Sequence, residues 1–137
     1  MKRVITLTFL ILSLTACDAS NPGGVLLNNE IPVSVLNYVR IKQIINKDEK
    51  IICYYDTTIF LDNTESFILT DKRIIHHFND RNVSIDLNDI DSVEYIRGGV
   101  NDIIIVESNQ GIPMKVTIAP LNDGQIFLNR LRRLTGK

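Results

Sequence analysis

Short apolar runs recur about every ten residues between Lys50 and Ile118, and residues that favour turns separate them. This spacing is typical of short antiparallel strands joined by sequential hairpins. Each gap contains Asn, Asp or Gly, which accept the backbone angles of tight turns. The pattern predicts seven strands, at residues 51–57, 66–70, 73–78, 83–87, 92–96, 103–107 and 113–118.

Two of these predicted strands alternate cleanly between apolar and polar residues, so we expect one face of each in the core and the other in water. The apolar positions are Val83, Ile85 and Leu87 in one strand, and Met114, Val116 and Ile118 in the other. By contrast, residues 103–106 are apolar on both faces. That run predicts either a strand covered on both sides or one that takes part in an interface.

A loose helical pattern precedes the strands, between residues 33 and 45. Its β-branched side chains would also suit a strand, but we predict a short helix there. Its apolar positions are Leu36, Val39, Ile41, Ile44 and Ile45.

A clearer amphipathic pattern follows the strands. Phe127, Leu131 and Leu134 are spaced at i, i+4 and i+7 with polar residues between them, and Asn122 or Asp123 can cap the helix that they predict. The apolar stripe of this helix must cover something, and the open end of a barrel is the expected place. Together the patterns predict a mainly β fold, a seven-stranded antiparallel barrel or sandwich closed by a C-terminal helix and preceded by a short N-terminal helix.

The first residues have a different pattern, with Lys2 and Arg3 followed by an apolar run, residues 4–14, that is too short to span a bilayer. The run ends in Leu-Thr-Ala-Cys, which resembles the lipobox of bacterial lipoproteins, where signal peptidase II cleaves before a cysteine that carries diacylglycerol. The resemblance implies a signal peptide at residues 1–16 and lipidation of Cys17. No cofactor is predicted other than this covalent lipid, diacylglycerol with acyl chains such as palmitate.

The resemblance to lipoproteins also implies a location. Asp18, directly after the cysteine, resembles the signal that retains enterobacterial lipoproteins in the inner membrane. We expect a protein anchored to a membrane outside the cytoplasm, facing the periplasm from the inner membrane in a Gram-negative cell. Residues 17–31 are turn-rich and predict a linker after the lipidated cysteine, and residues 32–137 predict one folded domain.

Charge argues against a nucleic-acid partner. The formal net charge of the chain is −1, and basic and acidic residues are interspersed along it. Phosphate-backbone binding needs a surplus of Lys and Arg on one face. Lys72 and Arg73 fall in a predicted turn, where solubility and protection of strand edges are the expected roles.

The sequence offers little for catalysis or metal binding. It contains no nucleophile elbow, P-loop or dinucleotide fingerprint, and its acidic residues are expected in turns or on wet faces. His76 and His77 are neighbours on a predicted strand, so they face opposite sides and cannot chelate one ion together. Cys53 lies in an apolar run and is expected to be buried and unpaired. We predict neither an enzyme nor a metal site.

Three segments carry a family resemblance. Residues 47–51, which contain EKI, residues 67–75, which contain LTDKR, and residues 84–95 resemble, in this order, segments of the bacterial pleckstrin-homology (PH)-like domains. That family implies a binding or scaffold fold. Eukaryotic PH domains hold inositol phosphates with Lys and Arg in their first hairpin, whereas residues 56–65 here contain no basic residue and three acidic ones, Asp56, Asp62 and Glu65. This difference argues against phosphoinositide binding.

These observations predict a membrane-tethered PH-like adaptor that recognises a protein partner at the cell envelope. One alternative is a structural or self-assembling envelope protein that uses residues 103–106 as an exposed β edge. A weaker alternative is direct contact with a lipid surface. The residues that could make this contact are Arg130, Arg132, Arg133 and Lys137.

Overall fold

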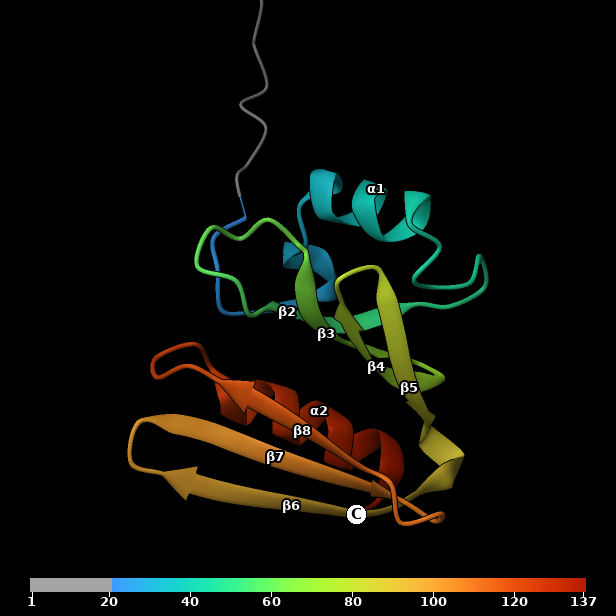
Figure 1. Cartoon of the computed structure of the whole chain (residues 1–137), viewed down its shortest axis with the longest axis vertical. Helices are drawn as coiled ribbons and strands as arrows, with labels where there is room; N and C mark the ends of the chain where they lie inside the picture. The colour runs from blue at the N-terminus through green and yellow to red at the C-terminus, as the bar shows by residue number, and fades with distance from the viewer. Residues whose placement is uncertain (1–20) are drawn as a thin grey trace, which may run out of the picture.

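The computed structural model describes residues 21–137, which form two antiparallel sheets and two α-helices (Figure 1). The first sheet has the order β1-β2-β3-β4-β5 and the second the order β6-β7-β8. The strands are β1 (Val25–Leu27), β2 (Ile51–Asp56), β3 (Glu65–Thr70), β4 (Arg73–Phe78), β5 (Arg81–Asp86), β6 (Ile90–Gly98), β7 (Asn101–Ser108) and β8 (Pro113–Ile118). The helices are α1 (Val33–Ile41) and α2 (Gly124–Thr135), with short 3-10 turns η1 (Asn28–Glu30) and η2 (Leu87–Asp89).

The prediction of a mainly β, antiparallel fold with a C-terminal helix is confirmed, and all seven predicted runs form strands, β2 to β8. The predicted barrel or sandwich of seven strands is wrong in its strand number, because the structure has eight strands, and the two separate sheets form no closed barrel. The additional strand, β1, has three residues and pairs with β2 in the register Val25↔Tyr55. Three residues are too few to show an alternation of apolar and polar side chains. The fold therefore begins inside residues 17–31, which were predicted to be a linker.

Strand β7 lies between β6 and β8, and both neighbours are hydrogen-bonded to it. Residues 103–106 are therefore not a free edge, and the expectation that they pair with another chain is wrong. Ile104 and Val106 face the core, whereas Ile103 and Ile105 are half-buried on the opposite face.

The five-stranded sheet is covered on both faces, which explains the continuous apolar runs of β2 and β3. Phe67 and Leu69 face an inner core that they share with the second sheet and α2. Ile68, which points the other way, belongs to an outer core with α1. Figure 1 shows α1 on one side of this sheet and α2 with the second sheet on the other.

Helix α1 buries Val35 and Val39, one turn apart, against that outer face. It ends at Ile41, and Gln43 takes a left-handed conformation that turns Ile44 back into the outer core. Ile41 itself is 78% exposed, so its predicted place on the apolar face is wrong.

Helix α2 contacts strands of both sheets, so its apolar stripe is covered, but not at the open end of a barrel as predicted, because the two sheets form no closed barrel. Phe127 and Leu131 are fully buried in the inner core, whereas Leu134 is 39% exposed and does not complete the stripe. Leu128, which the i, i+4, i+7 pattern omitted, takes that place in the core. Asp123 is the N-cap residue, but its side chain makes no capping hydrogen bond.

Cys53 is buried in the inner core and forms no disulfide within residues 21–137. Burial raises the pKa of its thiol to about 12, because a thiolate there would lose its hydration. Its predicted burial is confirmed. No helix between Asn21 and Lys137 is long and apolar enough to cross a bilayer.

Candidate functional site

The described chain contains a groove between β5 and the β7–β8 hairpin, with a volume of about 300 Å³. Ile85 and Met114 line it from the inner core, and the exposed side chains of Val83 and Ile112 flank it. The remaining lining residues are Ser84, Asp86, Asp89, Ser108, Asn109, Gln110 and Pro113.

Turn chemistry fixes which backbone groups of β5 face this groove. Asn79 and Asp80 join β4 to β5, and both have positive φ, 45° and 61°, the signature of a type I′ turn. Such a two-residue turn makes Phe78↔Arg81 a hydrogen-bonded pair, and hydrogen-bonded and non-hydrogen-bonded pairs alternate along the ladder. The N–H and C=O groups of Asn82, Ser84 and Asp86 therefore point away from β4.

These backbone groups remain available along the outer edge of β5. Within residues 21–137, β5 pairs with β4 alone, so this edge is the last of the five-stranded sheet. A backbone hydrogen bond from Asn109 N to Asp89 O, 2.8 Å long, holds the β7–β8 hairpin next to η2. The groove therefore has a strand edge on one side and a hairpin fixed in place on the other.

Charge in the groove is negative. Asp86 and Asp89 are the only ionisable residues among those that line it. A ligand that enters the groove would meet an apolar floor, a free strand edge and two carboxylates.

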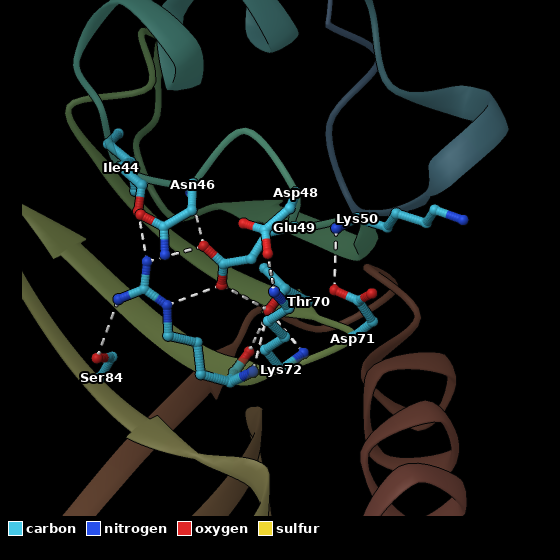
Figure 2. Close-up of polar contacts among 10 residues, drawn as sticks. Ile44, Asn46, Asp48, Glu49, Lys50, Thr70, Asp71, Lys72 and Ser84 are labelled. Atoms are coloured by element: carbon cyan, nitrogen blue, oxygen red, sulfur yellow. Dashed lines mark hydrogen bonds and ion pairs between the residues drawn. The ribbon is translucent and has the colours of Figure 1, made fainter.

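A second polar cluster, around the Glu49 carboxylate, lies between the α1–β2 loop and the β3–β4 hairpin (Figure 2). The Glu49 side chain has no exposed surface, and it accepts hydrogen bonds from Arg73 Nε at 2.8 Å and from an Arg73 terminal nitrogen at 3.0 Å. The Asn46 backbone N–H and the Thr70 hydroxyl donate to it at 2.6 and 3.1 Å. Arg73 also donates to the Ile44 carbonyl at 3.2 Å.

Each oxygen of Glu49 thus has two donors, and no acceptor site remains for a ligand. Burial opposes ionisation of this carboxyl group, but the hydrogen bonds from Arg73, Asn46 and Thr70 outweigh it, so the pKa of Glu49 is lowered. The cluster has a structural role, because it links the loop after α1 to the β3–β4 hairpin. The expectation that Arg73 serves solubility is wrong, because its side chain is mostly buried against Glu49.

Another acidic side chain, that of Asp56, organises the β2–β3 loop. Asp56 is buried and accepts hydrogen bonds from the backbone N–H and hydroxyl of Thr58, at 2.8 and 2.6 Å, and from Asn63 N at 2.7 Å. Sequence reasoning placed such residues on wet faces and so missed both Asp56 and Glu49. A polar residue at the end of an apolar strand, as Asp56 is, was the available signal.

The two histidines take separate places. His76 stacks on Phe67 with ring centroids 4.3 Å apart, whereas His77 is buried, with Tyr38 Oη 3.1 Å from its Nε2. In the described part of the chain, no three His, Cys, Asp or Glu side chains gather as a metal site would require.

The structure describes only some of the sequence-predicted site residues. Cys17 and Asp18 lie outside the described residues. Arg130 and Arg133 line a small hollow of about 250 Å³ beside Leu27 of β1, but Arg132 does not. All three arginines lie on α2.

Comparison of the chain with protein-family models, curated proteins and solved structures gave no match. The resemblances to lipoproteins and to PH-like domains therefore stay predictions, and the groove beside β5 is the best-defined candidate for ligand binding.

Proposed function

We propose that this chain is a membrane-tethered lipoprotein whose PH-like domain is a non-enzymatic adaptor at the cell envelope. Cys17 carries the lipid, Asp18 retains the protein in the inner membrane, and the domain faces the periplasm. The groove beside β5 binds an extended segment of a partner protein.

The order of the elements supports the PH-like assignment. Strands β2 to β5 lie in one sheet and β6 to β8 in the next, and α2 contacts both sheets (Figure 1). The three resembling segments lie at the start of β2, at the β3–β4 hairpin and from β5 into β6. On this view, β1 and α1 are additions that cover one edge and the outer face of the first sheet.

The free edge of β5 is the observation that carries the binding proposal. An extended peptide can add to such an edge through main-chain hydrogen bonds, while pockets for alternate side chains give specificity. Here Ile85 and Met114 offer an apolar contact for one side chain, and Asp86 and Asp89 favour a basic residue near it. The expected ligand is therefore an extended segment that contains apolar and basic residues.

Ser84→Pro tests this mode of binding, because proline removes the N–H that would pair with the peptide. That N–H points away from β4, so edge proline should leave the β4–β5 ladder intact. We expect a photo-crosslinking amino acid at Val83 to capture a discrete partner in intact cells, and Ser84→Pro to reduce the adduct at least about tenfold.

Ser84→Ala is the matched control, since it loses the same hydroxyl but retains the N–H, and it should keep the adduct. A photo-crosslinking residue at the exposed Ile41 of α1 should give none. Equal adducts in the proline and alanine variants, at equal folding stability, would contradict strand addition.

Cys17→Ser tests the tether. We expect this variant to leave the membrane fraction or to accumulate with residues 1–16 attached, because two or more acyl chains hold a protein essentially permanently and serine cannot carry the thioether. Cell fractionation and immunoblotting give the result. Cys53→Ala, which removes the buried thiol, should stay in the membrane fraction, and membrane retention of Cys17→Ser would contradict lipid anchoring.

A further inference from the structure

The most exposed large apolar side chains of the described chain gather on two loops. Ile59 and Phe60, in the β2–β3 loop, are 93% and 87% exposed, and Leu121, in the β8–α2 loop, is 100% exposed. These three residues are called the apolar tip below. Ile59 and Leu121 line one hollow, and exposed apolar side chains that lie together mark a place where a partner or a membrane is met.

The two loops lie together at the point where the described chain begins. Gly23 and Gly24 share a hollow of about 430 Å³ with Ile59 and Leu121. Val25 N donates to Asn122 O at 3.0 Å, so strand β1 is bound directly to the β8–α2 loop. Figure 1 shows the first described residues, in blue, beside the β2–β3 loop.

Hydrogen bonds inside the β2–β3 loop hold the apolar tip outward. Besides the three bonds that Asp56 accepts, Tyr54 Oη donates to Asn63 at 2.7 Å, and Asp62 N donates to the Thr58 hydroxyl at 3.1 Å. Tyr55 Oη ties the second loop to the sheet by accepting a hydrogen bond from Ala119 N at 3.0 Å. The loops are thus built to present Ile59, Phe60 and Leu121 rather than to bury them.

We infer that the apolar tip rests in the lipid bilayer to which the protein is tethered. This inference rests on the proposed lipidation of Cys17. Five residues lie between Cys17 and Gly23, so the six steps from one Cα atom to the other can span at most about 22 Å. A domain whose fold begins this close to its anchor brings the loops around Gly23 to the membrane surface.

Charge decides which part of the bilayer the tip meets. The β2–β3 loop contains no Lys or Arg, and Asp62 and Glu65 both follow its apolar residues. Anionic headgroups would repel these carboxylates, so the contact is with the apolar interior and not with lipid phosphate. In an uncharged bilayer, binding through the tip is therefore insensitive to salt, unlike contact of the α2 arginines with anionic lipid.

The position of the tip also orients the groove. In Figure 1 the tip loops lie at one end of the molecule, whereas β5 and the β7–β8 hairpin meet at the other. With the tip in the bilayer, the groove beside β5 faces away from the membrane, toward a partner in the surrounding space.

Tryptophan fluorescence tests the inference directly, because the chain contains no tryptophan. Phe60→Trp places one reporter on the tip of the full-length lipidated protein, reconstituted in phosphatidylcholine vesicles. We expect about twofold quenching by brominated acyl chains and a blue-shifted emission, since a side chain seated about 5–10 Å into the headgroup–acyl boundary lies near the bromine atoms. Neither effect should change with salt.

Ile112→Trp, at the groove, is the matched control and should show no quenching. Leu121→Trp should behave as Phe60→Trp does, and neither substitution disturbs the core because both side chains are exposed. Absent quenching at both tip positions, or equal quenching at Ile112→Trp, would overturn the inference. So would a blue shift that grows with protein concentration without vesicles, which would show a second copy on the tip.

The mass of the N-terminal peptide separates this inference from the proposed function. A lipid-bearing Cys17 with an unquenched tip would leave the tether standing and reject the membrane contact. A protein without lipid on Cys17 would reject the tether first.

Discussion

Replacing Phe127 by Ala is expected to lower the free energy of unfolding by about 3–5 kcal/mol, the range for large aromatic side chains removed from a core. Phe127 is fully buried in α2, in the inner core that joins the two sheets. The cavity left by its ring would face strands of both sheets, and neither sheet can move in without breaking its own ladder. Such a loss is a large fraction of the stability of a domain of this size. Urea unfolding of the chain produced from residue 18 onward measures it.

Two substitutions in the same helix serve as controls for Phe127→Ala. Leu134→Ala should cost no more than about 1 kcal/mol, since its side chain is 39% exposed and little apolar area is lost. Arg132→Ala, on the exposed face of the same helix, should cost less than about 1 kcal/mol. If Phe127→Ala were as mild as these two, α2 would not be packed between the sheets.

Replacing Glu49 by Ala is expected to cost about 3 kcal/mol, the lower end of the range for breaking a buried ion pair from one side. The change leaves the largely buried Arg73 guanidinium without its counter-ion and removes the acceptor for Asn46 N and the Thr70 hydroxyl. Asp48→Asn, which breaks the exposed pair with Lys72, is the control and should change stability little.

The ion pair between Glu49 and Arg73 should also make the free energy of unfolding depend on pH. The folded-state pKa of Glu49 is lower than its unfolded value, so its contribution is present above about pH 4.3 and is lost as pH falls through the folded pKa. The wild type should therefore lose stability between pH 5 and pH 3 more steeply than Glu49→Gln. Parallel stability profiles for the two proteins would show that Glu49 is not held ionised by Arg73.

The sequence predicted secondary structure correctly where a residue pattern is compatible with only one kind of environment. The strict alternation of Met114, Val116 and Ile118 located its strand correctly, whereas the turn after β4 was predicted over residues 79–82 and is formed by Asn79 and Asp80 alone, so β5 begins two residues earlier than predicted. The three-residue β1 escaped because its pairing depends on the edge of β2, a partner that follows far along the chain. The burial of both faces of the first sheet could not be predicted from the apolar run around Ile68 either, since such a run does not show which elements cover it.

The candidate site depended still more on distant parts of the chain. Asp86 and Asp89 border a groove only because the β7–β8 hairpin folds back beside them. Glu49 and Arg73 are 24 residues apart, and nothing in either segment alone distinguishes a buried pair from solvated charges. The apolar tip could not be predicted from the sequence for a similar reason, because Leu121 lies beside Ile59 only through the contact of two loops.

The proposed membrane tether depends on lipidation of Cys17, and the mass of the mature N-terminal peptide tests it most directly. Protein purified from bacterial membranes and digested with protease should yield a first peptide that begins at Cys17 and carries the added mass of a diacylglyceryl group, with or without an amide-linked acyl chain. A mature N-terminus at any other residue, or an unmodified Cys17, would contradict the account.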